Sequence, residues 1–295
     1  MGLVIFEGGG ARLEETARKP CLKRHDATRP AVTPKLSVQL TAALTTHHST
    51  ILSRFMSHSP PDFRVMTSGA FTAAHFKLLP LVEQLTGQQV ITVTTSIGTG
   101  ETSIPSRLAR LEPVDIVIVA DSVLDQFVQA GFIVKDSKVR LASSGIGMAV
   151  REGEPAPDLS SAQALKQTLL KAQRIAYSAS ESGKYLTTVL FQRLGIEHEC
   201  LPKSRLIGGG ERTGDVVARG EADLACQQLS ELYPVKGIAH ITPLPLEVQK
   251  ISIFSAGVAS WCADAVKARE VIAFLRGESA RLAMVQTGLE PYPSQ

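Results

Sequence analysis

The sequence of 295 residues has no apolar run long enough to cross a membrane. About 18 to 20 consecutive apolar residues span a bilayer, whereas the longest run here, around 115–120, is only as long as a strand. With 44% hydrophobic and 20% charged residues, the composition is typical of a soluble protein of one or two domains. We therefore expect no integral membrane segment.

Cysteine is scarce and widely spaced. The four cysteines, Cys21, Cys200, Cys226 and Cys262, form no CxxC pair, and no histidine stands at a metal-ligand spacing from them. Zinc sites and disulfide frameworks usually show such closely spaced ligands. The pattern favours buried or incidental thiols, and we expect neither a metal site nor a cofactor.

The chain also lacks an excess of basic residues outside its first segment. Its formal net charge is +3, but residues 1–61 contain eight Lys or Arg and four Asp or Glu, which leaves 23 basic and 24 acidic residues in the remainder. A nucleic-acid-binding face requires Lys and Arg clustered on it. We expect no nucleic-acid partner.

The first 61 residues differ in character from the rest. The opening MGLVIF is too short for the apolar core of about 7 to 15 residues in a secretory signal, and clear periodicity begins only after Pro60 and Pro61. We interpret 1–61 as a disordered or mis-called N-terminal extension, with the natural start at Met56. The missing signal predicts a cytoplasmic protein, and a mis-called start leaves the periplasm as the alternative.

From residue 62 onward, short apolar runs alternate with segments of helical periodicity. The first predicted helix, 70–86, places Phe71, Ala74, Leu78, Leu81 and Leu85 on one face. Strands that alternate with helices indicate parallel sheets covered on both faces, so the predicted fold class is α/β. The further predicted helices are 102–111, 122–130, 161–171, 183–194, 264–275 and 278–286.

Small hydroxyl residues and glycines recur where a predicted strand passes into a helix. They occur in TSGAF from residue 67, TSIGTGE from 95, VADSVLD from 119, YSASESGKY from 177 and GGGERTGDV from 208. Helix capping explains any one of these turns. Several of them at the carboxyl ends of strands, where helix N-termini point outward, favour a site for an oxyanion or a carboxylate.

Four motifs follow one another in an order known from one protein family. They are MTSGAF with the helix end VEQLTG, the turn TTSIGTG, EPVDIVIVADS at 112–122, and VVARGEADLACQQ at 216–228. Together they resemble the substrate-binding proteins of bacterial ABC importers with the type II periplasmic-binding fold, in particular the molybdate-binding branch, which has aconitate isomerase-like members. The resemblance covers about 62–290.

The resemblance implies a two-lobed type II periplasmic-binding-protein-like fold, with two mixed sheets flanked by helices and a two-strand hinge. Crossing strands at 145–152 and 250–259 would divide the chain into lobe one, 62–145 plus 256–290, and lobe two, 146–255. Ser68 and Ser96 match the serines that hold the anion in molybdate binders. The family tyrosine after GEAD is replaced by Cys226, Gln227 and Gln228, which favours a larger ligand such as a polycarboxylate.

Two functions remain open from the sequence. The first is binding, without chemistry, of a small anion in the interlobe cleft, either a molybdate-like oxyanion or a polycarboxylate. The second is an aconitate isomerase-like enzyme that moves a proton on a tricarboxylate in the same cleft. An ABC permease would be a partner only if the protein is exported, and a pure interaction module is a third alternative. The predicted ligand-binding residues are Ser68, Gly69, Ser96, Thr99, Ser178, Ser180, Thr213 and Gln228.

No catalytic base can be assigned from the pattern. His75 in the first helix and Tyr177 at a strand end are the candidates, but a structural role explains each of them more simply. Tyr185 and Glu181 are further alternatives of the same kind. Arg107 and Arg110 could attract a tricarboxylate, although a solvated helix face is the simpler interpretation of this pair.

Overall fold

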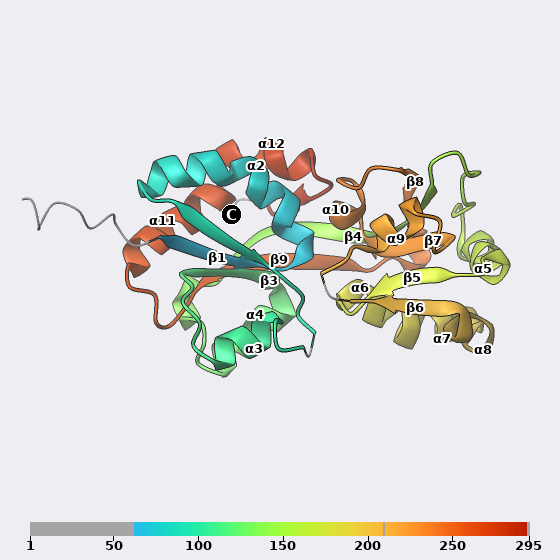
Figure 1. The fold of residues 1–295 in the computed structure, drawn as a ribbon, viewed down its shortest axis with the longest axis horizontal. Helices are drawn as coiled ribbons and strands as arrows, with labels where there is room; N and C mark the ends of the chain where they lie inside the picture. The colour runs from blue at the N-terminus through green and yellow to red at the C-terminus, as the bar shows by residue number, and fades with distance from the viewer. Residues whose placement is uncertain (1–61, 99, 209, 294–295) are drawn as a thin grey trace, which may run out of the picture. The chain divides into compact units, whose positions relative to one another are not determined.

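The computed structural model of this chain describes residues 62–98, 100–208 and 210–293, which form alternating strands and helices (Figure 1). The predicted extension 1–61 lies outside the described residues. The strands are β1 (Phe63–Thr67), β2 (Val90–Thr94), β3 (Ile116–Ala120), β4 (Val139–Arg151), β5 (Ile175–Ser178), β6 (Ser204–Ile207), β7 (Leu224–Gln228), β8 (Ile238–Pro243), β9 (Ile251–Val258) and β10 (Glu290–Pro291). The helices are α2 (Gly69–Thr86), α3 (Ile104–Ala109), α4 (Asp121–Gln129), α5 (Ala162–Lys171), α6 (Glu181–Tyr185), α7 (Phe191–Leu194), α8 (Glu197–Cys200), α9 (Thr213–Ala218), α10 (Leu229–Leu232), α11 (Ala265–Arg276) and α12 (Glu278–Val285).

The first sheet contains β2, β1 and β3 as parallel neighbours, followed by β9 and β4, which run antiparallel. In Figure 1, α2, α11 and α12 lie on one side of this sheet, and α3 and α4 lie on the other. Strand β3 is buried along its whole length, as expected for a strand covered on both faces. The carboxyl ends of β1, β2 and β3 therefore meet at one edge, where the turns into the following helices begin.

The second sheet repeats the arrangement with β6, β5 and β7 in parallel, while β4 pairs antiparallel with both β7 and β8. Helices α9 and α10 pack on its strands, and α10 also contacts α2 of the first sheet. A π-helical turn, Leu186–Leu190, joins α6 to α7, so the predicted helix 183–194 is a helical stretch of mixed type.

Strand β4 connects the two sheets. Its first half, Val139 to Gly145, pairs with β9, and its second half, from Ile146 onward, pairs with β7 and β8. The antiparallel strands β4 and β9 run where the crossing strands are predicted, and they make both sheets mixed rather than purely parallel. The predicted α/β class with two mixed sheets is confirmed.

The buried apolar side chains form separate clusters. One cluster contains residues between 63 and 142 and between 254 and 289, and two others contain residues between 146 and 248. Each sheet therefore packs against its own helices to exclude water, which is the main source of folding free energy. The predicted lobe boundaries, 62–145 plus 256–290 and 146–255, stay a prediction.

Helix α2 begins directly after a strand and ends at a glycine. Ser68 precedes it in an extended conformation (φ −75°, ψ 161°), and Gly87 follows it in the left-handed region (φ 65°), donating its N–H to the carbonyl of Glu83 at 2.9 Å. A left-handed residue at this position is typically glycine because it has no Cβ. The local sequence thus determines both ends of the helix.

The buried face of α2 differs from the prediction. Leu81 and Leu85 are 44% and 43% exposed, so their placement on the core face is wrong. Val82, which is fully buried, continues the face instead, because it lies one helical turn beyond Leu78.

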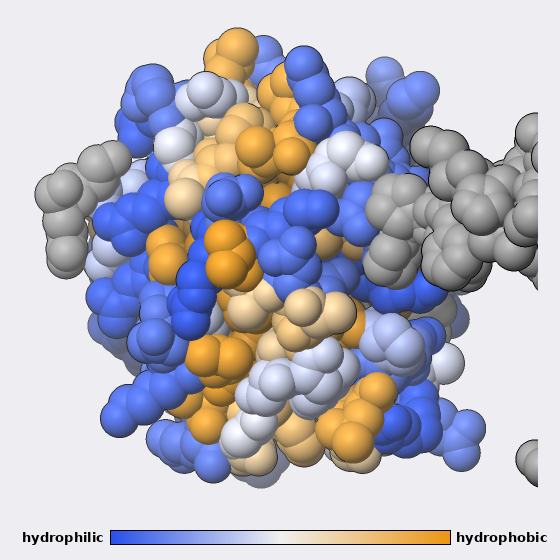
Figure 2. Space-filling model, turned by 90° about the vertical axis from the view of Figure 1, so that its left-hand side faces the viewer, coloured by the Kyte–Doolittle hydropathy of each residue, from blue (hydrophilic) through white to orange (hydrophobic). Residues whose placement is uncertain are grey.

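Large apolar side chains are exposed on α2, α11 and α12. Val266 on α11 is 70% exposed, and Leu282 and Val285 on α12 are 67% and 59% exposed. Figure 2 views the side of the molecule where α11 lies in Figure 1 and shows apolar residues interspersed with polar ones.

Within the part of the chain that the structure describes, no helix is both long and apolar enough to cross a membrane.

Candidate functional site

A cavity of about 400 Å³ lies where strand-to-helix turns of both sheets face one another. The first sheet contributes the turns after β1 and β2, and the second contributes those after β5, β6 and β7. The cavity therefore combines helix N-termini with hydroxyl and amide side chains. Such a lining provides hydrogen-bond donors for an anion without requiring a counter-ion.

Most of the predicted ligand-binding residues line this cavity. Thr213 does not line it, and Thr99 lies outside the described residues. The turn pattern along the sequence thus brings residues of both sheets together, although a binding role for each residue stays a prediction. The residues that line the cavity are Ser68, Gly69, Ser96, Ser178, Ser180 and Gln228.

Two hydroxyl groups in the cavity lining have no hydrogen-bond partner. Ser68 is 8% exposed and Ser230 is 1% exposed, and the Oγ atom of each is buried and makes no hydrogen bond. Ser68 precedes α2 but its side chain makes no capping bond. Buried polar groups are almost always paired, so an unpaired one needs an explanation. Hydrogen bonds from these two hydroxyls to a bound guest would provide it.

A chain of three serines borders the cavity at the start of α6. Ser178 Oγ lies 2.8 Å from Ser180 Oγ, which lies 2.9 Å from Ser182 Oγ. Gly183 makes this tight turn feasible, because a Cβ at that position would overlap the carbonyl oxygen of Ser178. The hydroxyl-rich segment of the sequence is therefore folded into one connected network.

Gln228 lines the cavity but its amide bonds within the protein. With its nitrogen toward the crossing strand β4, it donates to the carbonyl oxygens of Ser144 at 2.9 Å and Gly145 at 3.0 Å. Its oxygen then accepts from Ser252 Oγ of β9 at 2.9 Å. Gln228 therefore connects β7 to both crossing strands.

The sequence reasoning missed Glu231, an acidic side chain in the cavity lining. It is only 9% exposed, and burial raises its pKa to about 7, although a hydrogen bond from Gln227 opposes the rise. The bond runs from Gln227 Nε2 to Glu231 Oε1 over 2.9 Å. A carboxyl group of this acidity exchanges protons near neutral pH. An acid shortly after a strand end was the only available sequence signal.

Glu231 packs against the start of α2. A Cβ placed on Gly69 would overlap Glu231 Oε1, so the absence of a side chain at Gly69 makes room for the carboxyl group. The contact joins α10 of the second sheet to α2 of the first. The carboxyl group thus lies close to the positive end of a helix of 18 residues.

The two candidate catalytic residues lie outside the cavity lining. His75 is buried at 1% exposure, with its Nε2 2.8 Å from Thr92 Oγ1, and burial lowers its pKa to about 4. Its side chain faces β2 rather than the cavity, so it does not contact a guest there. Tyr177 packs against the apolar core of the second sheet.

The other two candidates are bonded at or near the cavity rim. The hydroxyl group of Tyr185 donates to the carbonyl oxygen of Val248 at 2.8 Å. Glu181 does line the cavity, but its carboxylate pairs with Lys250 at 3.1 Å. Because burial raises the pKa of Glu231 to about 7, Glu231 is the more suitable proton acceptor.

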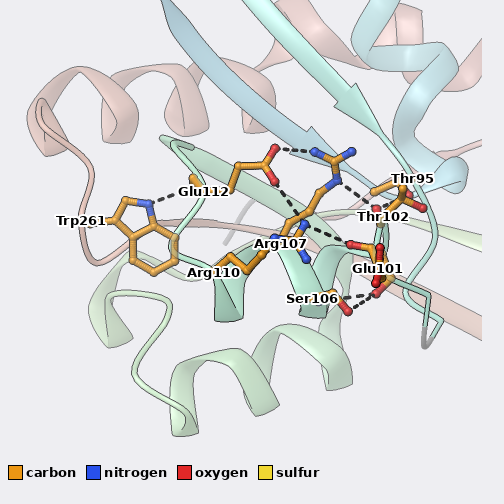
Figure 3. Close-up of polar contacts among 9 residues, drawn as sticks. Thr95, Glu101, Thr102, Ser106, Arg107, Arg110, Glu112 and Trp261 are labelled. Atoms are coloured by element: carbon orange, nitrogen blue, oxygen red, sulfur yellow. Dashed lines mark hydrogen bonds and ion pairs between the residues drawn. The ribbon is translucent and has the colours of Figure 1, made fainter.

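Arg107 and Arg110 are engaged with an acidic side chain away from the cavity (Figure 3). Arg107 forms an ion pair with Glu112 and donates its Nε to the carbonyl of Thr102 at 2.9 Å. Arg110 donates to the carbonyl of Glu101 at 3.0 Å and lies 3.6 Å from the Glu112 carboxylate. The pair therefore braces the loop before α3 and does not hold a cavity ligand.

Cations at the cavity are paired as well. Arg212 binds Asp215 through two contacts of 2.8 Å. Among residues 62–98, 100–208 and 210–293, no cluster of three His, Cys, Asp or Glu side chains is arranged to hold a metal ion. The lining therefore combines neutral donors, charged side chains held in ion pairs, and the carboxyl group of Glu231, whose pKa is raised by burial.

A two-lobed α/β fold with a donor-lined cavity between strand ends is that of periplasmic-type binding proteins. The chain belongs to the family of bacterial extracellular solute-binding proteins, whose family model matches residues 63–290. This membership confirms the predicted resemblance and shows a fold that binds a ligand.

Individual relatives support the same assignment. An aconitate isomerase from Pseudomonas sp. is 42% identical over 232 residues, covering 78% of this chain and 88% of that protein. The periplasmic molybdate-binding protein of Azotobacter vinelandii matches with a TM-score of 0.64 and 17% identity, covering 79% of this chain and 100% of that one. The substrate-binding domain of a molybdenum ABC transporter from Clostridium difficile matches with a TM-score of 0.58 and 15% identity, covering 79% and 99%. At these identities the two solved structures show the fold alone.

Proposed function

We propose that this protein is an isomerase that moves a proton along aconitate, an allylic tricarboxylate, in the cavity between its sheets. The observation that carries this proposal is Glu231, a carboxyl group in the cavity lining whose pKa of about 7 suits it to take and return a proton. The 42% identity to an aconitate isomerase gives independent support.

The reaction balances without an oxidant or a further reactant. Aconitate has a methylene group that is acidic because it adjoins both a carboxylate and a carbon–carbon double bond. Glu231 takes one proton from this carbon, the electron pair forms a new double bond, and the former double bond places its electrons on the far carbon. The same proton, or one from solvent, returns there. The orientation of the carboxylates when the proton is transferred determines whether the cis or the trans isomer forms.

Donors in the lining would stabilise the negative charge that develops on a carboxylate during the transfer. The unpaired hydroxyls of Ser68 and Ser230 are two of them, and the N–H groups of Gly69 and Ala70 at the start of α2 are others, since the first N–H groups of a helix have no acceptor within it. Donors that are already in place lower the free energy of such a transition state. Ser96 and Ser180 also line the cavity, and in this proposal their hydroxyls orient the remaining carboxylates.

The test is an NMR assay that follows conversion of cis-aconitate to trans-aconitate by the purified protein. The wild type is expected to convert the substrate, and Glu231→Gln is expected to lower the rate by about 10² to 10⁴-fold, the usual contribution of a general base. Glu278→Gln is the matched control, because that side chain is 89% exposed on α12. Absence of turnover by wild-type protein would retire the isomerase, and full turnover by Glu231→Gln would remove Glu231 from the reaction.

Binding of a small anion without chemistry is the second candidate, and the family membership favours it. Calorimetric titration with the aconitates, citrate, molybdate, tungstate and sulfate separates the two. An isomerase is expected to bind the tricarboxylates and to ignore the tetrahedral oxyanions. Tight binding of an oxyanion with no aconitate turnover would establish a binding protein instead.

The compartment in which the protein acts stays a prediction, and so does an ABC permease as its partner. Cell fractionation of the full chain, with a cytoplasmic and a periplasmic marker enzyme, tests both. Recovery in the cytoplasmic fraction would exclude a permease partner.

A further inference from the structure

Gln227 has a side-chain amide whose orientation is determined by its neighbours. Its Oε1 accepts two hydrogen bonds from Thr213, one from the backbone N at 3.2 Å and one from Oγ1 at 2.6 Å. A backbone N–H can only donate, so the acceptor end of the amide must face Thr213. The donor end consequently faces Glu231, with Nε2 2.9 Å from Oε1.

This arrangement is enclosed by protein. Thr213 is fully buried and Gln227 is 3% exposed, so water does not compete for either bond. Thr213 begins α9 and Gln227 lies near the end of β7, and α9 packs on β7. Two rigid elements therefore hold the amide in one orientation, and bonds in such an enclosed site are stronger than in water.

The fixed amide distinguishes the two oxygens of the Glu231 carboxyl group. Oε1 faces an N–H donor at all times, so it acts as an acceptor in both protonation states. The exchangeable proton must therefore reside on Oε2. A carboxyl group that presents a single, defined oxygen to its substrate meets the geometric requirement of proton transfer better than a freely rotating one.

We infer that Gln227, held by Thr213, is a positioning residue that assigns the transferred proton to one oxygen of Glu231. The inference rests on the proposed role of Glu231 as the proton carrier. It also gives a function to Thr213, which the sequence places in the site although the residue does not line the cavity. The chain Thr213–Gln227–Glu231 acts on the guest only through its last member.

Removing the Gln227 donor should make Glu231 less acidic. Burial is the main cause of its raised pKa, and the Gln227 hydrogen bond is the opposing one. The charged residues that share the cavity lining with Glu231 are paired, namely Glu181 with Lys250, Glu211 with Arg219 and Arg212 with Asp215.

Four elements pack against α10, namely α2, β4, β7 and β8. His240 on β8 is exposed to solvent, and Cys226 on β7 is a buried thiol. On α2 and β4 the pairs are His75 with Thr92, Lys77 with Gln286, Glu83 with the backbone N of Val90, Arg140 with Asp121, and Arg151 with Glu154.

The experiment compares Gln227→Met, which keeps the side-chain volume but removes the donor, with the wild type. Two readouts are taken: the pH profile of kcat/KM for aconitate, and the carboxyl ¹³C titration of Glu231 in glutamate-labelled full-length protein, assigned by its loss in Glu231→Gln. The Glu231 titration is expected to shift upward by about one pH unit, and the ascending limb of the pH profile should shift with it. Gln192→Met is the matched control, since Gln192 bonds Glu197 at 3.3 Å on the exposed surface.

A second pair of variants keeps the test decisive if Gln227→Met does not fold. Thr213→Val removes the hydroxyl donor and is expected to shift the titration in the same direction by a smaller amount, whereas Thr213→Ser keeps the hydroxyl and should restore the wild-type value. An unchanged Glu231 titration in the folded variants would overturn the inference. Full turnover by Glu231→Gln would instead refute the proposed function, while the ¹³C titration would still report on the amide.

Discussion

Replacing Glu231 by glutamine should change how the stability of the protein depends on pH. The pKa of Glu231 is raised by burial from 4.5 to about 7, whereas the unfolded chain keeps the ordinary value. Between pH 4.5 and 7 the native state therefore holds a proton that the unfolded state has lost, and the free energy of unfolding falls as pH rises. The stabilisation is complete below pH 4.5 and is lost above pH 7. A shift of this size from 4.5 to about 7 corresponds to about 3 kcal/mol.

His75 has the opposite effect over nearly the same range. Burial lowers its pKa from 6.5 to about 4, so the unfolded chain takes up a proton that the native state refuses as the pH falls. The contribution of His75 is present above pH 6.5 and is lost toward pH 4, again by about 3 kcal/mol. The contributions of Glu231 and His75 to the pH dependence of stability thus offset each other in the wild type. When one residue is replaced, the pH dependence due to the other should become visible.

The assay is urea denaturation of the ligand-free protein at half-unit steps from pH 4.5 to 8. Fluorescence of Trp261, the single tryptophan, and circular dichroism should give coincident transitions at each pH. Relative to wild type, Glu231→Gln is expected to gain about 3 kcal/mol between pH 4.5 and 7, and His75→Gln is expected to gain a similar amount as the pH falls from 6.5 to 4.5. Glu278→Gln serves as the exposed control. A stability difference between Glu231→Gln and wild type that stays constant with pH would refute the reasoning.

Three further substitutions test the packing around the site. Gly69→Ala should lower ligand affinity at least tenfold, about 1.4 kcal/mol, because its Cβ would displace the Glu231 carboxyl group. The measurement is calorimetric titration. The control is Gly100→Ala, whose ligand affinity should be unchanged because its Cβ meets no atom within 4 Å. Gly147→Ala should lose about 1 to 3 kcal/mol of stability, since a Cβ there would overlap a leucine side chain, and an unaltered urea midpoint would contradict this packing. Asp223→Ala should lose about 1 to 3 kcal/mol at pH 7, because its carboxylate accepts two backbone N–H groups at 2.8 and 2.9 Å. Although burial opposes the effect, these bonds and the one from Arg174 lower the pKa of Asp223, so the loss should shrink only as the pH falls through that lowered pKa.

Local sequence patterns were sufficient to predict the elements that build the site. Helix α2 begins after Ser68, whose extended backbone ends the preceding strand, and it ends at Gly87, whose left-handed conformation is favoured by glycine. The hydroxyl-bearing turns likewise fall at strand ends. Since the carboxyl ends of parallel strands share one edge of a sheet, this local pattern also predicted that Ser68 and Ser96 lie in one cavity.

The side that a helical residue faces was harder to predict. His75, one of the candidate catalytic residues, faces β2, and burial lowers its pKa to about 4. Leu81 was expected on the same face as Leu78, whereas the buried arc of the helix centres on Leu78 and Val82. Periodicity gives the angle between residues but not the direction of the neighbouring sheet, so the sequence did not reveal either orientation.

The amino-acid sequence alone determined the α/β order of elements, the family and the set of hydroxyl-bearing turns, because these depend on local propensity, capping and periodicity. Only the tertiary structure decided that Glu231 is a cavity residue with a pKa near neutrality. In the sequence it is an ordinary acid in a short helix, and its pKa of about 7 arises when α10 packs against α2 and removes water from the carboxyl group. Desolvation depends on residues far apart in the chain, so it becomes a property of Glu231 only when the two sheets are assembled.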